Sequence, residues 1–151
     1  MGEKLFAGEI MKWFVVAVVV VFGVAPAWAQ TMTQSVCQQN FVVEGTARVT
    51  AMNFRSWREF PNLPQPTALK NLRAAMLAEG FSNIGVDAEA GALTTVQETS
   101  GSGRPQALRV TARKSGNGTR VDAVFMIQAG QTADSNYVRS ALCRVIDAAN
   151  L

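Results

Sequence analysis

Two runs of alternating apolar and polar residues, joined by a short turn rich in glycine, constrain the fold of this chain most. The runs cover residues 106–114 and 120–128, and Ser-Gly-Asn-Gly-Thr connects them at residues 115–119. Alternation with a period of two is typical of a half-buried strand, and Asn-Gly between two such runs favours a two-residue hairpin turn. The sequence therefore predicts an antiparallel hairpin whose turn residues are Asn117 and Gly118.

This turn also predicts which residues of the hairpin face each other. On one side the expected pairs are all apolar: Leu108 with Ile127, Val110 with Phe125, and Ala112 with Ala123. On the other side the expected pairs are mixed: Arg113 with Asp122, Thr111 with Val124, and Arg109 with Met126. Because side chains alternate between the two faces of a strand, we expect the first side to face the core and the second side to be the outer face of a sheet.

Three other segments have the pattern of strands. Residues 41–51 alternate over a length that favours a half-buried strand. Residues 83–86 and 93–98 are further strand candidates, bounded by turn-forming residues. Residues 53–66 contain three prolines, so we expect this segment to connect the first strand to a helix.

That helix is predicted at residues 68–79. Its apolar residues share one face, and the hydroxyl of Thr67 can cap its first turn. Gly80 follows the last helical residue, where glycine readily adopts the left-handed conformation that ends many helices. Phe81 is expected to supply the apolar contact that accompanies such an ending.

A second helix is predicted within residues 132–151, with Thr132 or Asp134 as its N-cap. The order of elements is then β-α-β-β-β-β-α. The predicted fold class is α+β: a two-layer sandwich of an antiparallel-rich sheet of about five strands, with two helices on one face. This topology resembles small sheet-and-two-helix domains of bacterial envelope-assembly lipoproteins, and folds of this kind host many functions.

The first part of the chain has the pattern of an export signal. Its apolar run at residues 13–25 is shorter than the roughly 20 residues that span a bilayer, and the A-x-A pattern at residues 27–29 is typical of a cleavage site. We therefore predict a signal peptide at residues 1–29 and a single exported domain at residues 30–151, without a stable membrane anchor after cleavage. A short uncleaved anchor is the alternative. Acidic residues precede the apolar run, so the true start is predicted at Met11.

Cys37 and Cys143 are the two cysteines of the chain. In an oxidising compartment, two cysteines form a disulfide by default. The alternatives are a redox pair or two free thiols, but a C-x-x-C spacing is missing. We predict a structural disulfide that joins the start of the domain to its last helix, in a periplasmic or secreted protein.

The composition argues against several kinds of chemistry. The chain has no histidine, which is the commonest general base and transition-metal ligand. Its formal net charge is +3, and the basic residues form no stripe of the kind that binds nucleic acid. Asp87 and Glu89 form a D-x-E pair that could bind a cation or act as an acid–base couple, or simply belong to a solvated turn. We therefore predict no catalytic residues, no cofactor, no metal site and no nucleic-acid partner.

Two groups of residues are candidates for binding. The segment at residues 53–60 interleaves aromatic residues with arginines, a combination that is typical of interface hot spots and can also hold an anionic ligand. Its candidates are Arg55, Trp57 and Arg58. The second group is expected on the outer sheet face: Arg48, Arg109, Arg113, Val124 and Met126. Each group has an alternative interpretation: the aromatic residues of the first group cover one end of the core, and the outer face of the second group is exposed to solvent without binding a partner.

The sequence thus favours a non-catalytic interaction module that binds another envelope or secreted protein, as an accessory factor or an inhibitor. The outer sheet face or the segment around Trp57 is its expected binding surface. The alternative is a binding domain for an anionic small molecule, lipid or glycan, held between the sheet and a helix in a cavity of several hundred cubic ångströms. A third hypothesis is an enzyme that uses the carboxylates of Asp87 and Glu89.

Overall fold

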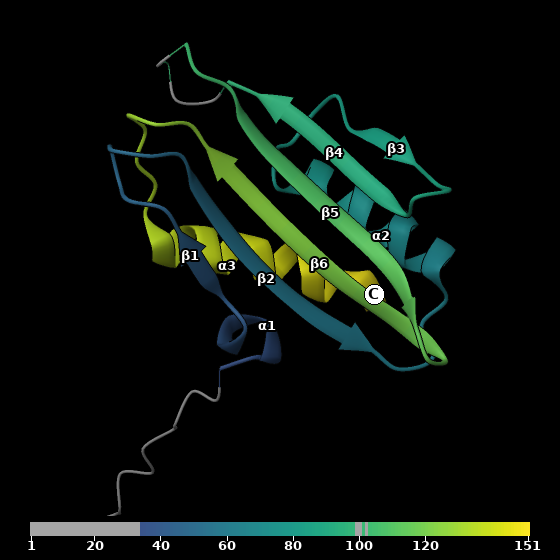
Figure 1. Cartoon of the computed structure of the whole chain (residues 1–151). Coiled ribbons are helices and arrows are strands. Elements are labelled where there is room, and N and C mark those ends of the chain that lie inside the picture. The colour runs from purple at the N-terminus through teal and green to yellow at the C-terminus, as the bar shows by residue number, and fades with distance from the viewer. Residues whose placement is uncertain (1–33, 99–100, 102) are drawn as a thin grey trace, which may run out of the picture. The chain divides into compact units, whose positions relative to one another are not determined.

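The computed structural model describes residues 34–98, 101 and 103–151, so the predicted signal peptide at residues 1–29 and the predicted start at Met11 lie outside the described residues. The described chain forms one open sheet of six antiparallel strands, in the order β1-β2-β6-β5-β4-β3 (Figure 1). The strands are β1 (Val42–Glu44), β2 (Met52–Phe60), β3 (Gly85–Asp87), β4 (Ala92–Gln97), β5 (Gln106–Ser115) and β6 (Gly118–Ile127).

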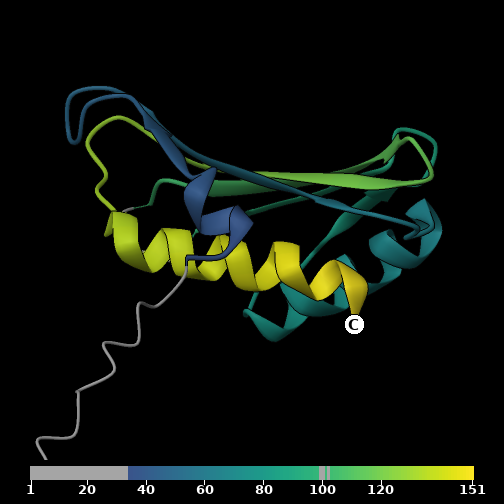
Figure 2. The same cartoon turned by 90° about the horizontal axis from the view of Figure 1, so that it is seen from below.

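The helices of the described chain are α1 (Val36–Gln39), α2 (Gln65–Ala78) and α3 (Ser135–Asp147), followed by a short 3-10 turn, η1 (Ala148–Asn150). Figure 2 shows α2 and α3 on the same face of the sheet. The predicted α+β class, with two helices on one face of an antiparallel sheet, is confirmed. The sheet has six strands instead of about five, because β1 and β2 are separate strands. The sequence pattern also does not predict the four-residue helix α1.

The hairpin between β5 and β6 turns one residue earlier than predicted. Ser115 pairs with Gly118, so the turn residues are Gly116 and Asn117 instead of Asn117 and Gly118. Gly116 has a φ of 56°, which suits glycine at the first central position of a type II′ turn. Gly118 belongs to the strand, and any side chain there would clash with the carbonyl oxygen of Phe60 at the end of β2.

The predicted partners in this hairpin are therefore wrong, whereas the predicted faces are right. The observed apolar pairs are Leu108 with Phe125, Val110 with Ala123, and Ala112 with Val121. Every partner moves by two positions, and a shift of two leaves each side chain on the same face of the sheet. On the outer face, Arg109 lies opposite Val124 instead of Met126. Arg113 lies opposite Arg120 but still reaches Asp122 along a diagonal, at 2.9 Å.

The prediction for residues 41–66 is wrong in its largest part. Only residues 42–44 of the predicted first strand are a strand, and most of the predicted connector is β2. Met52, Phe54, Ser56 and Phe60 alternate along β2 and are buried beneath the helices. The alternation of aromatic residues and arginines is thus the pattern of a half-buried strand, and the prolines follow its last residue.

Helix α2 begins earlier than predicted, whereas its end is confirmed. Its N-cap position is Pro64 and not Thr67, so the hydroxyl of Thr67 does not cap the first turn. At the other end Gly80 has a φ of 91°. Its N–H group donates to the carbonyl of Leu77, and the N–H group of Phe81 donates to the carbonyl of Met76. These two hydrogen bonds form a Schellman motif.

Helix α3 and the disulfide hold the end of the domain in place. Of the two predicted caps, the structure uses Asp134, whose carboxylate accepts a hydrogen bond of 2.7 Å from the N–H group of Tyr137. The predicted disulfide is present between Cys37 in α1 and Cys143 in α3, whose Cα atoms lie 5.6 Å apart. Both half-cystines are buried in the core between sheet and helices. A disulfide suggests an oxidising, extracytoplasmic location.

Candidate functional site

The outer face of the sheet, opposite the helices, contains the larger candidate site. No helix of the described chain covers this face, which is turned towards the viewer in Figure 1. Its middle is a shallow hollow of about 580 Å³ over β2, β6 and β5. Side chains from all three strands line the hollow, among them Arg55, Trp57, Arg109, Asp122 and Val124.

Strand register places these side chains in rows across the sheet, with β6 as the middle strand. In one row, Val124 lies between Arg55 of β2 and Arg109 of β5. The next row places Asp122 between Trp57 and Thr111. Because each row spans two strand spacings, the Cα atoms of β2 and β5 are about 10 Å apart. We call the strip between them the β6 groove, with Val124 and Asp122 on its floor.

An ion-pair network fixes the orientation of Trp57. The guanidinium carbon of Arg120 lies 4.0 Å from the centre of the Trp57 ring, which is a cation–π contact. Arg120 also binds Asp122 at 3.0 Å, and Arg113 binds the other oxygen of the same carboxylate at 2.9 Å. Asp122 is about three-quarters buried, and its contact with Arg120 is partly buried, whereas its contact with Arg113 is exposed. The indole ring therefore presents a preformed, half-buried apolar surface beside the groove.

The remaining arginines of the hollow differ in their pairing. Arg55 binds Glu44 of β1 at 3.0 Å, and both side chains are half exposed. Arg109 is exposed and lies opposite Val124 of β6 and Thr94 of β4. Within residues 34–98, 101 and 103–151, no hydrogen bond or ion pair joins Arg109 to another side chain.

No family model matches this chain, and no curated protein sequence is significantly similar to it.

The structure brings together five of the eight residues proposed for interaction. The hollow is lined by Arg55, Trp57, Arg109, Arg113 and Val124. Met126 lies on the same face, two residues further along β6, opposite Asn53. The other two candidates lie elsewhere. Arg120 and Glu44 also belong to the site but were not among the candidates. The alternation of β6 already places Arg120 on the same face as Asp122, so the sequence pattern could have identified Arg120.

Arg58 and Arg48 do not belong to this site. Arg58 points to the helix side, where its guanidinium binds Asp147 of α3 at 2.7 Å and lies 4.9 Å from the ring centre of Phe60. It therefore helps to hold α3 on the sheet. Arg48 lies in the exposed turn between β1 and β2, with a φ of 67°. Phe54, in β2, is fully buried. For this residue the structure agrees with the alternative interpretation, in which the aromatic residues of the segment cover the core.

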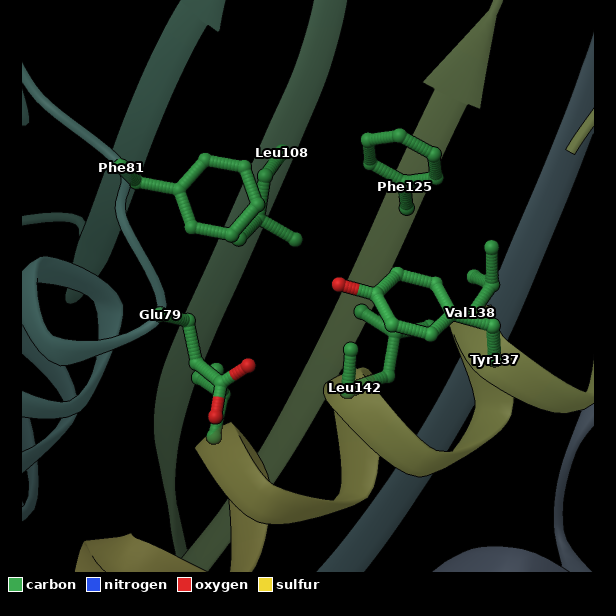
Figure 3. Close-up of a pocket in the computed structure, with 9 residues that line it drawn as sticks. Glu79, Phe81, Leu108, Phe125, Tyr137, Val138 and Leu142 are labelled. Atoms are coloured by element: carbon green, nitrogen blue, oxygen red, sulfur yellow. The ribbon is translucent and has the colours of Figure 1, made fainter. Parts of the chain in front are cut away.

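Between the sheet and the helices, the described residues form a small notch. Its volume is about 80 Å³. Figure 3 shows side chains from the sheet and from α3 converging on it, with Phe81 across from Phe125 and Tyr137. The walls are mostly apolar: Phe81, Leu108, Phe125, Val138 and Leu142. A ligand held between sheet and helix needs several hundred cubic ångströms. The described part of the chain does not offer that volume at this place.

Asp87 is the last residue of β3 and Glu89 lies in the turn between β3 and β4; both residues are exposed. Asp87 accepts a hydrogen bond of 2.8 Å from the N–H group of Ala90, which is the usual role of aspartate in a turn. Among the described residues, no group of three or more Cys, Asp or Glu side chains is arranged to hold a metal ion. None of the described helices has the length and apolar character needed to cross a membrane.

An ion pair at the rim of the notch leads to a pH prediction. Arg144 donates two hydrogen bonds of 2.7 Å to the carboxylate of Glu79, and these bonds lower the pKa of Glu79. A lowered pKa in the folded state stabilises the protein above the ordinary glutamate pKa of about 4.3, and this stabilisation is lost as the pH falls through the lower folded value.

We therefore expect Glu79→Gln to be less stable than the wild type at pH 7, by less than about 1 kcal/mol because Arg144 is half exposed. The difference should disappear towards about pH 2, where the carboxyl is protonated in both folded and unfolded chains. Urea unfolding at several pH values measures it, and the exposed Glu89→Gln serves as the matched control. An equal difference at both ends of the pH range would show that the ion pair is not its source.

Proposed function

We propose that the protein is exported through a cleaved signal peptide to the periplasm or the outside of the cell. There it acts as a non-catalytic interaction module. The apolar run and cleavage pattern of the leader support the export step. The buried Cys37–Cys143 disulfide supports the compartment, because such bonds persist where the surroundings are oxidising. The partner is another envelope or secreted protein.

The binding surface in this proposal is the outer sheet face around Trp57. The observation that carries it is the preformed Trp57 surface, which is fixed by Arg120 on a face that α2 and α3 leave uncovered. Val124 and Met126 are only partly buried and extend the apolar surface along β6. Tryptophan and arginine in a shielded centre, ringed by polar residues, are the usual composition of a protein-binding hot spot.

A small anionic ligand is the second candidate for this hollow, and the feature in its favour is Arg109, which has no ion-pair partner among the described residues. Sites for small molecules bury most of the ligand surface, whereas this hollow is open on its outer side. A protein partner covers such an open surface completely and excludes water from Trp57. The open shape of the hollow therefore favours the protein partner.

Replacement of Trp57 is the first test of the proposal. We expect Trp57→Ala to bind the partner at least about 30-fold more weakly, because central tryptophans at interfaces contribute 2 kcal/mol or more. The measurement is quantitative capture of envelope proteins on the immobilised protein, followed by titration of the captured partner. Tyr137→Ala is the matched control, since Tyr137 is an exposed aromatic residue on the helix side.

The proposal predicts one partner that depends on Trp57 and is retained by Tyr137→Ala. Capture of a protein with the same affinity by the wild type and both variants counts as background binding. If every captured protein behaves in this way, the outer face is not the binding surface. Thermal unfolding of each variant checks that the loss of binding does not come from loss of the fold.

A further inference from the structure

The four arginines of the hollow are in two different electrostatic states. Arg113 and Arg120 share Asp122, and Arg55 binds Glu44. Each of these three guanidinium groups is therefore paired with a carboxylate of the same chain, although Arg113 and Arg120 share one carboxylate. Arg109 has no such partner among the described residues, although it lies in the same row as Arg55 and Val124.

The position of Arg109 makes its uncompensated positive charge accessible to a partner segment bound in the β6 groove. Its row places Arg109 on the β5 side of the groove, opposite Arg55 on the β2 side. The Cα atoms on the two sides are about 10 Å apart, and the hollow of about 580 Å³ above them has room for a short polypeptide segment. A segment that packs on Val124 therefore has the Arg109 guanidinium at its edge.

The charge of the hollow selects the kind of segment. Four arginines and two carboxylates, Glu44 and Asp122, line it, so its formal net charge is +2. The surplus favours an acidic partner, since complementary charges speed association and exclude wrong partners. A lipid surface or a nucleic acid is bound by clusters of several unpaired cations, whereas the described residues of this face offer one arginine without an ion-pair partner, next to Val124.

We propose that the partner segment in the β6 groove is acidic and apolar, and that it places an aspartate or glutamate carboxylate on the guanidinium of Arg109. This inference rests on the proposed function, because it names the chemistry of the partner that docks beside Trp57. The guanidinium donates two parallel hydrogen bonds to the carboxylate, and a neighbouring apolar side chain of the partner packs on Val124. Arg109 is then the residue that selects acidic partners.

The test uses a defined peptide as well as the captured partner. A capped pentapeptide of alternating glutamate and valine is titrated into the protein while backbone amide signals are followed by NMR. We expect shifts at β2, β5 and β6 around Arg109, and binding at least about tenfold weaker for Arg109→Gln, because a hydrogen-bonded charge pair is lost. The matched control is Arg73→Gln, which removes an exposed arginine from α2.

Three further arms sharpen this test. A peptide with glutamine in place of glutamate should bind at least about tenfold more weakly than the acidic peptide. Inorganic phosphate and vesicles of phosphatidylglycerol should shift the Arg109 region less than the peptide does at equal anion concentration. Equal binding by wild type and Arg109→Gln, or stronger binding of phosphate or vesicles, would overturn the inference.

The captured partner separates this inference from the proposed function. A partner lost with Trp57→Ala and weakened about tenfold or more by Arg109→Gln supports both. A partner lost with Trp57→Ala but bound normally by Arg109→Gln overturns only the acidic segment and leaves the docking face in place. A partner that depends on neither residue overturns both.

Discussion

Replacement of both half-cystines, in Cys37→Ala/Cys143→Ala, is expected to destabilise the domain by about 4 kcal/mol. The disulfide joins residues separated by 106 positions, and closing so long a loop in the unfolded chain removes much of its entropy. It is also the covalent link that holds the four-residue helix α1 on α3. Urea unfolding measures the change, and the unfolding temperature should fall by more than about 10 °C.

A reducing agent separates the bond from the loss of two buried sulfur atoms. Wild type unfolded and refolded in dithiothreitol should become nearly as unstable as the double variant, whereas the double variant should not respond to the reagent. Because both sulfurs are buried, reduction requires unfolding, and the samples must reach equilibrium in urea. Identical unfolding curves of wild type with and without reductant would contradict the stabilising role of the bond.

Phe54→Ala is expected to destabilise the domain by about 3–5 kcal/mol. Phe54 is fully buried on the helix side of β2. Its ring centre lies 6.3 Å from that of Phe41 and 6.1 Å from that of Phe125, so its removal leaves a cavity beside these two aromatic side chains. Urea unfolding of the purified variant gives the change in the free energy of unfolding.

Trp57→Ala is the matched comparison for Phe54→Ala, because the two residues lie on opposite faces of the same strand. Loss of the half-buried Trp57 should cost clearly less stability while it abolishes most of the binding. Similar destabilisation by both substitutions would mean that Trp57 is a core residue and not a binding residue. The comparison therefore tests the assignment of the two faces of β2 without knowledge of the partner.

The faces of the sheet could be predicted from the sequence, but the exact register could not. Alternation identifies the face of each side chain on β5 and β6, and that assignment survives a shift of two residues. Asn117-Gly118 and Gly116-Asn117 are both good turn pairs, with the same apolar pattern behind them. The choice between the two turns depends on a contact between residues far apart in the sequence. Gly118 lies against the backbone of Phe60, where a side chain does not fit.

The candidate site was predictable in its composition and not in its position. Trp57 and its arginines stand out in the sequence, but the prolines after them lead to the prediction of a connector. The opposite directions of Arg55 and Arg58 follow only once the segment is known to be a strand. Residues 41–51 alternate as well as β2 does, and local pattern alone does not show which segment pairs with β6. The pairing partner of a strand depends on the whole sheet, and only the fold places Arg109 and Arg55 on either side of Val124.

Site-specific photo-crosslinking tests the central claim, binding through the outer sheet face, most directly. A photoreactive benzophenone amino acid replaces Met126 on the outer face in one variant and Leu77, an exposed residue of α2, in the other. Both variants are irradiated in cells that export the protein. Our account predicts a covalent adduct with a second protein from position 126 and none from position 77. An adduct formed only from position 77 would contradict it.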